Sequence, residues 1–231
     1  ALGLRSRKLP RPGLTVVLQN GARSDGSFVL VHLAALVASA RNAPARESDQ
    51  HEENTSKVTW ISAREPAVHW RRVLRRRCPR GVGVVDIASD SNDLDAWDGF
   101  DGAEVITKVI ESAVTTSDLI VVDDVTDLCC SNDGDDQTDA FVDVVAYWKS
   151  LAKAHECHLV LRLRVCDNVP REAQAALCTS LGDTCVIVSE LQSGASSDID
   201  GTIQVVRRCA GKQTVSSEVR FASREERASR M

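Results

Sequence analysis

Residues 14–28, Leu14-Thr-Val-Val-Leu-Gln-Asn-Gly-Ala-Arg-Ser-Asp-Gly-Ser-Phe28, decide the fold. Thr15 to Gln19 form a β-branched apolar run that predicts a short buried strand. Residues 27–40 are rich in Ala and Leu and predict a helix. Between them, Gly21 and Gly26 have the spacing of a G-x-x-x-x-G loop, in which backbone N–H groups hold phosphates. The stretch therefore predicts the strand–loop–helix unit of a phosphate-binding α/β domain.

The loop lacks the residues that bind and activate a nucleotide. In the pattern G-x-x-x-x-G-K-[ST], the Lys contacts the outer phosphates and the hydroxyl holds Mg²⁺. Here Ser27 stands at the Lys position and Phe28 at the hydroxyl position, while Asp25 adds a carboxylate where an anion would bind. Arg23 is the only cation in the loop. We therefore expect a degenerate phosphate loop with no cofactor, no metal ion and no catalytic residue.

Strand and helix patterns alternate after this loop. Apolar runs predict strands at 57–61, 82–87, 118–124 and 158–165, and helical periodicity predicts helices at 67–77, 103–116, 138–155 and 170–181. Three strand patterns then follow one another, at 184–190, 202–208 and 215–221. This order predicts an α/β fold with a mostly parallel sheet, flanking helices and an antiparallel C-terminal strand extension.

The strand at 118–124 ends in two carboxylates, Asp123 and Asp124. In nucleoside triphosphatase cores of the RecA-like type, an acid at the end of such a strand reaches Mg²⁺ near the phosphate loop. We therefore expect a RecA-like domain. Two alternatives for the acids stay open: they cap the end of the sheet, or Asp123 or Asp124 still holds Mg²⁺ in a divergent ATPase.

Length and composition favour one globular domain at 14–221, preceded by a basic, flexible leader at 1–13 and followed by a polar tail at 222–231. The eight Cys residues include no C-x-x-C pair, which argues against a zinc site and fits a reducing cytosol or nucleus. No apolar run approaches the roughly 20 residues of a membrane helix, so we expect no membrane partner. Surface insertions are expected at 41–56, 88–101 and 129–137.

The predicted helix at 67–77 is intensely basic. Its arginines are Arg71, Arg72, Arg75, Arg76 and Arg77. Arg71 and Arg75 stack one turn apart, as do Arg72 and Arg76, so like charges are crowded on the helix surface. Backbone phosphates of RNA or the acidic surface of a neighbouring subunit would relieve this repulsion. The other interpretation is a solvated helix face, because charge runs are usually solvated.

Several of these residues together resemble a known family. Ser24 to Phe28 enter an apolar helix that contains His32, the pair His69-Trp70 follows in the second helix, and Val121 to Asp124 end the fourth strand. This combination resembles Elongator complex protein 6, over about residues 14–221. The most specific motif is Ser24 to Phe28, since Val-Asp-Asp strands are shared with many ATPases.

The resemblance implies a RecA-like, non-catalytic subunit of the Elongator accessory ring, a hetero-hexamer with Elongator proteins 4 and 5. It implies that the assembled ring binds tRNA and supports wobble-uridine (U34) modification, while catalysis belongs to a different Elongator subcomplex. No cofactor is expected for the chain itself, and ATP binding is possible only at the level of the ring. The alternative within the same fold is another non-catalytic RecA paralogue in a recombination or assembly complex.

Overall fold

The computed structural model describes residues 12–21, 26–39, 58–78, 81–87, 100–129, 135–167, 169–191, 200–209 and 212–221. The strands are β1 (Gly13–Asn20), β2 (Val58–Ser62), β3 (Val82–Asp86), β4 (Leu119–Val122), β5 (His158–Val165), β6 (Thr184–Ser189), β7 (Gly201–Cys209) and β8 (Lys212–Phe221). The helices are α1 (Ser27–Ser39), α2 (Ala67–Arg77), α3 (Phe100–Ala113), α4 (Asp135–Ala154) and α5 (Arg171–Ala175), with a 3₁₀ turn η1 (Thr126–Cys129) and a π-helical segment η2 (Ala176–Leu181).

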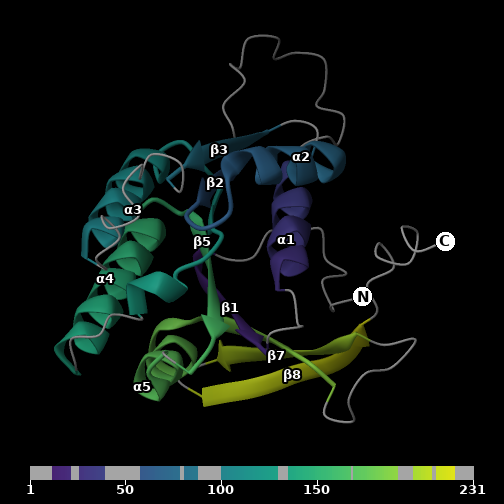
Figure 1. Ribbon diagram of the computed structural model, residues 1–231, viewed down its shortest axis with the longest axis vertical. Coiled ribbons are helices and arrows are strands. Elements are labelled where there is room, and N and C mark those ends of the chain that lie inside the picture. The colour runs from purple at the N-terminus through teal and green to yellow at the C-terminus, as the bar shows by residue number, and fades with distance from the viewer. Residues whose placement is uncertain are drawn as a thin grey trace.

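All of these strands form one eight-stranded sheet in the order β3-β2-β4-β5-β1-β6-β7-β8. The strands from β3 to β6 in this order pair in parallel, and β7 and β8 extend the sheet in antiparallel pairs. Figure 1 shows the β7–β8 extension below the helical layers. The predicted mixed sheet is therefore confirmed. Because β1 pairs with both β5 and β6, its carboxyl end lies within the sheet, between those two strands.

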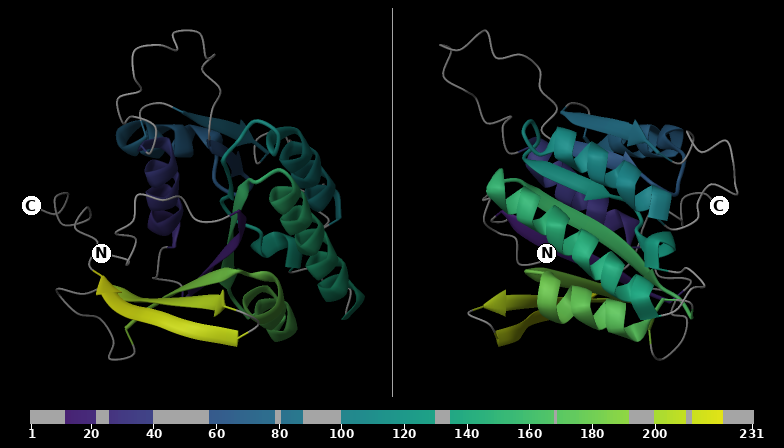
Figure 2. Two further views of the ribbon diagram at one scale, coloured as in Figure 1. Left: turned by 180° about the vertical axis from the view of Figure 1, so that it is seen from behind. Right: turned by 90° about the vertical axis from the view of Figure 1, so that its left-hand side faces the viewer.

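Helices cover both faces of the parallel sheet, as the two further views show (Figure 2). On one face, α1 and α2 bury Leu30, Trp70 and Leu74 against strand side chains that include Trp60. On the other face, α3, α4, α5 and η2 bury a second cluster that includes Trp148. The parallel strands read as continuous apolar runs because both of their faces are covered.

Some element boundaries differ from the sequence-based expectations. The helix expected at 103–116 begins at Phe100, and the helix expected at 138–155 begins at Asp135, so both insertions before them are shorter than predicted. The helix expected at 170–181 is α5 followed by the wider turn of η2, in which the Gly182 N–H donates to the carbonyl of Leu177, five residues back. Such boundary shifts arise because periodicity weakens where a helix meets its cap.

The expected leader, the tail and the insertion at 41–56 lie almost wholly outside the described residues. In the expected insertion at 88–101, residues 88–99 lie outside the described residues. Among the helices that the structure describes, none combines the length and the apolar character that crossing a membrane requires.

Candidate functional site

The carboxyl edge of the sheet, where β1, β5 and β4 end side by side, is the candidate site. In doubly wound sheets ligands bind beyond this edge. The structure describes the loop residues Gly21, Gly26, Ser27 and Phe28. Arg23 and Asp25 lie outside the described residues. The edge can therefore be described on both sides of the loop tip.

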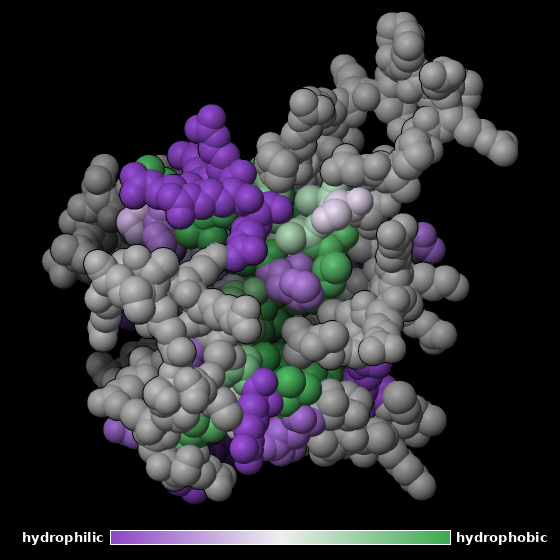
Figure 3. Space-filling view, turned by 90° about the vertical axis from the view of Figure 1, so that its right-hand side faces the viewer, coloured by the Kyte–Doolittle hydropathy of each residue, from purple (hydrophilic) through white to green (hydrophobic). Residues whose placement is uncertain are grey.

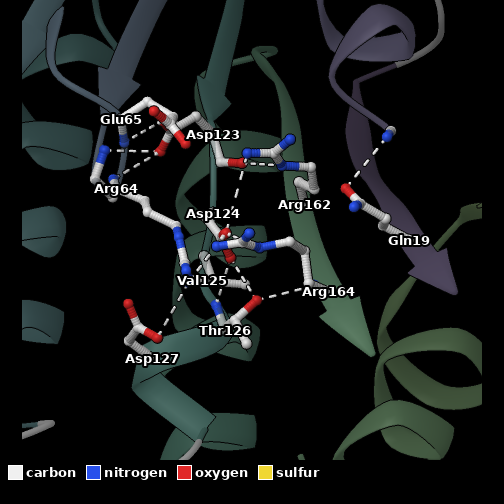
Figure 4. A network of polar contacts seen from close by, with 12 residues as sticks. Gln19, Arg64, Glu65, Asp123, Asp124, Val125, Thr126, Asp127, Arg162 and Arg164 are labelled. Atoms are coloured by element: carbon white, nitrogen blue, oxygen red, sulfur yellow. Dashed lines mark hydrogen bonds and ion pairs between the residues drawn. The ribbon is translucent and has the colours of Figure 1, made fainter. Parts of the chain in front are cut away.

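A side chain of the protein itself accepts a hydrogen bond from the phosphate loop. Gln19, at the end of β1, is 8% exposed, and its Oε1 accepts from the Gly26 N–H at 3.2 Å (Figure 4). Backbone N–H groups of this loop are the donors that hold phosphate in a nucleotide-binding protein. The Gly26 N–H is therefore already satisfied by Gln19. Nothing in the residue pattern of the strand distinguished Gln19 beforehand.

A carboxylate lies against the first glycine of the loop. Gly21 has φ +104°, and a Cβ added there would come within 2.7 Å of Oε1 of Glu190, which follows β6. Only glycine adopts this backbone conformation without strain. The Glu190 side chain therefore lies close against the backbone at the start of the loop.

Phe28, at the hydroxyl position of the loop pattern, makes an apolar contact. Ser27 begins α1, and the ring of Phe28 packs on Phe221 at the end of β8, with ring centroids 4.9 Å apart. Phe28 is partly buried against the cluster beneath α1 and α2. This contact joins the start of α1 to the last residue of β8, an edge strand of the sheet. An aromatic ring has no ligand for Mg²⁺.

Asp123 is fully buried and faces the segment that joins β2 to α2. Its Oδ1 accepts from the backbone N–H of Ala63 at 2.7 Å and of Arg64 at 3.3 Å. Its Oδ2 accepts from the Trp70 indole N–H at 2.7 Å and from the Glu65 N–H at 3.4 Å. The two carboxylate oxygens thus hold this turn in place, which is a structural role.

Burial raises the pKa of Asp123, and the hydrogen bonds from Ala63 and Trp70 only partly offset that effect. A carboxylate that is dry and surrounded by N–H donors lies away from the solvent through which Mg²⁺ would reach it. The expectation that an acid ends this strand is met, and Trp70 of the His69-Trp70 pair is its partner. Sequence spacing could not reveal this contact, because it joins residues 53 positions apart.

Asp124 is the centre of an ionic cluster on the same edge. Its Oδ2 lies 2.7 Å from Nε of Arg164 and 4.0 Å from both Nη2 of Arg162 and Nη1 of Arg64. Its Oδ1 accepts from the backbone N–H of Thr126 at 2.9 Å and from the Thr126 hydroxyl. Burial raises the pKa of Asp124, while Thr126 and the guanidinium groups oppose that effect.

The arginines of this cluster come from two parts of the chain, strand β5 and the segment that joins β2 to α2 (Figure 4). Arg162 is 5% exposed in β5 and also donates its Nε–H to the backbone carbonyl of Asp123, while Arg164 lies two residues further along the strand. Arg64 also faces Asp127, with 3.6 Å between Nη1 and Oδ1. Two arginines within an otherwise apolar strand were the available sequence signal, since charged side chains are buried only when paired.

The basic face of α2 is a separate surface. All five arginines of the helix are exposed, and Figure 3 shows hydrophilic side chains gathered over this helix. Arg75, Arg76 and Arg77 occupy its last turn, where positive charge favours the helix dipole. Arg71 donates to the Val84 carbonyl at 3.5 Å. Within the described part of the chain, Arg72, Arg75 and Arg76 make no hydrogen bond or ion pair. Their charge is therefore open to a partner.

Among the described residues, no group of three or more His, Cys, Asp or Glu side chains could hold a metal ion. The acidic loop at 129–137 lies partly outside those residues, and the side chains at the start of α4 are not described.

Comparison with known proteins shows the class of fold. No protein-family model matches the chain, and no curated protein matches it. Among solved structures, a KaiC-like protein from the hyperthermophilic archaeon Pyrococcus horikoshii OT3 matches with a TM-score of 0.52 and 12% identity, over 93% of this chain and 87% of that chain. The chain therefore has a RecA- and KaiC-like fold.

Proposed function

We propose that this protein is a non-catalytic RecA-fold subunit of a hetero-oligomeric ring. The observation that carries the proposal is the environment of Asp123, whose carboxylate binds four N–H donors of its own chain in a site closed to solvent. An acid held in this way positions a turn and does not hold a metal ion. The Gln19 contact with Gly26 and the aromatic ring of Phe28 support the same interpretation on the loop side.

The particular ring follows from the sequence resemblance described above. Ser24 to Phe28, the His69-Trp70 pair and the Val121–Asp124 strand end resemble Elongator complex protein 6. We therefore propose a place beside Elongator proteins 4 and 5, in a cytosolic or nuclear ring that binds tRNA for wobble-uridine modification, with catalysis in a separate subcomplex. The contact between Trp70 and Asp123 supports this choice, because it gives two of the resembling motifs one shared structural role.

Nucleotide binding by the purified chain tests the first part of the proposal. Isothermal titration with ATP and Mg²⁺ is expected to give no heat of binding at micromolar nucleotide. A variant with Ser27→Lys and Phe28→Thr is the informative companion, because it restores the missing groups but leaves Asp25 and Glu190 beside the loop. Micromolar, Mg²⁺-dependent binding by the unmodified chain would overturn the proposal in favour of a divergent ATPase.

Co-purification tests the second part. Two different RecA-fold proteins recovered in equal amounts with this chain would support the ring. Recovery with recombination proteins would instead favour a non-catalytic recombinase paralogue, the second candidate within this fold.

The basic face of α2 supports the proposed contact with tRNA. Changing Arg72, Arg75 and Arg76 together to Ala is expected to weaken tRNA binding by the assembled ring. The logarithm of the binding constant should also fall less steeply with the logarithm of the salt concentration. The slope should become shallower by roughly 0.7 to 0.9 for each lost phosphate contact. Lys108→Ala is the control, since Lys108 is exposed on α3, on the other face of the sheet. If the triple variant dissociates the ring first, the face contacts an acidic neighbour. If nothing changes, the face is only solvated.

A further inference from the structure

Two cysteine side chains lie in contact where η2 meets β6. Cys178 belongs to η2 and Cys185 to β6, and their Sγ atoms are 2.8 Å apart. A disulfide requires an S–S distance of about 2.05 Å. The sulfur atoms therefore need to move by less than about 1 Å to form a bond. Both residues are thiols in the structure.

Neighbouring elements hold this segment in place. Lys149 of α4 donates to the Leu181 carbonyl, and Arg208 of β7 donates to the Ser180 carbonyl at 2.6 Å. The Gly182 N–H donates to the carbonyl of Leu177 at 2.7 Å and closes the wide turn. Residues on both sides of the thiol pair are thus anchored. These hydrogen bonds hold the backbone next to Cys178 in place relative to α4 and β7.

The two thiols have different surroundings. Cys178 is partly exposed, whereas Cys185 is 1% exposed. A hydrogen bond from Cys185 lowers the pKa of Cys178, although burial opposes this effect. The same hydrogen bond raises the pKa of Cys185, and burial adds to the rise. Cys178 is therefore the thiol that an oxidant reaches first and the one that loses its proton more readily, and Cys185 is the second thiol beneath it.

We propose that Cys178 and Cys185 form a reversible oxidation site whose oxidant is a hydroperoxide. The Cys178 thiol releases its proton, its thiolate attacks the hydroxyl oxygen of the peroxide, and the O–O bond breaks. Cys178 becomes a sulfenic acid, and the departing oxygen takes up the released proton and leaves as an alcohol or as water. The sulfur of Cys185 then attacks the Cys178 sulfur, the S–O bond breaks, and the departing hydroxide takes the Cys185 proton as water. Two thiols are oxidised to one disulfide, and one peroxide is reduced. A low-molecular-weight thiol reverses the reaction by exchange.

Cys166 and Cys157 differ from this pair. Cys166 is exposed after β5 but has no second sulfur in contact among the described residues. Cys157 is buried, and burial raises its pKa to about 12. An exposed single thiol reacts without forming an internal disulfide, and a buried thiol with a high pKa reacts slowly. Cys166 is therefore the matched control.

The disulfide can be located in the full-length chain. Reduced protein is treated with one equivalent of hydrogen peroxide, alkylated and digested with trypsin. The peptide 172–207 contains Cys178 and Cys185 as its only cysteines, and Asp183 is the one acid between them. We expect this peptide to lose two hydrogen atoms and to carry no alkyl group. Cleavage before Asp183 should leave two fragments that separate only after reduction.

Variants assign the order of the two steps. Cys185→Ala should accumulate the Cys178 sulfenic acid, which dimedone traps, and Cys166→Ser should oxidise like the unmodified chain. If Cys185→Ala does not fold, the peptide masses of the unmodified chain decide alone. The proposal is wrong if both thiols of 172–207 remain alkylated while Cys166 is oxidised, or if Cys178 is found linked to another cysteine.

Discussion

Replacing Asp123 with Ala tests whether the acid at the end of β4 is a structural anchor or a remnant of nucleotide chemistry. The change removes both carboxylate oxygens and leaves four N–H donors without this acceptor, of which those of Ala63 and Trp70 are in buried hydrogen bonds. Each buried donor left unsatisfied costs about 1 to 3 kcal/mol. The bonds from Ala63 and Trp70, both 2.7 Å, dominate, since the other two are 3.3 and 3.4 Å long. We expect the free energy of unfolding to fall by about 3 to 5 kcal/mol.

The Asp123→Asn variant separates hydrogen bonding from charge. Burial raises the pKa of Asp123, so removing the charge recovers part of the cost of desolvation. The amide still offers one oxygen, but its NH₂ group faces two N–H donors. We expect a loss of about 1 to 2 kcal/mol, smaller than that of the Ala variant.

Urea unfolding followed by tryptophan fluorescence measures these differences, because Trp60, Trp70 and Trp148 are buried and become exposed on unfolding. Asp127→Ala is the control on the same edge, since its side chain is 56% exposed and its ion pair with Arg64 is long. It should change stability by less than about 0.5 kcal/mol. If Asp123→Ala is as harmless as Asp127→Ala, Asp123 is not an anchor, and the structural role assigned to it is wrong.

Three further variants test individual contacts. Phe28→Ala should lower the free energy of unfolding by about 1 to 3 kcal/mol in urea, less than for a fully buried Phe; no change would place the ring on the surface. Gly21→Ala should lower the free energy of unfolding more than Gly81→Ala does, because both glycines have positive φ but only a Cβ at position 21 would clash with Glu190. Equal losses of stability in the two variants would contradict this clash. Burial works against a low pKa at Asp183, yet the Leu14 N–H and Lys149 lower it overall. The stability that Asp183 contributes is therefore present above the unfolded pKa of about 4 and is lost as the pH falls through the folded pKa. When the free energy of unfolding is measured against pH, Asp183→Asn should make its fall on the acid side less steep.

The parallel part of the sheet was predictable because its strands are mostly apolar runs bounded by turn residues. The prediction for β5 matches the structure at both ends, and so does that for α2. Patterns of this kind report burial on both faces, which is a local property of parallel strands. The position of Asp123 and Asp124 at a strand end followed for the same reason. The RecA-like arrangement could be inferred because the loop and these acids are about 100 residues apart with the right elements between them.

The partners of the site residues could not be predicted in the same way. Gln19 reaches Gly26 across the loop, and Trp70 reaches Asp123 from another helix, and neither pairing has a sequence period. Arg162 and Arg164 were visible as charges inside an apolar strand. Assigning them to Asp124 requires knowing that β5 lies beside β4, which is a property of the folded sheet.

The carboxyl edge of this sheet is balanced electrically by its own residues. Three guanidinium groups face three carboxylates: the cations are Arg64, Arg162 and Arg164, and the acids are Asp123, Asp124 and Asp127. In a nucleotide-binding RecA domain, this edge presents unpaired N–H groups and a cation, and the bound nucleotide supplies the negative charge. Here Gln19 and Asp123 supply the acceptors within the chain. Because these donors and charges are already paired, leaving the site empty costs no further free energy. An anion would first have to displace the acceptors that the chain itself supplies. The fold can therefore remain stable without nucleotide, which is what a structural subunit requires.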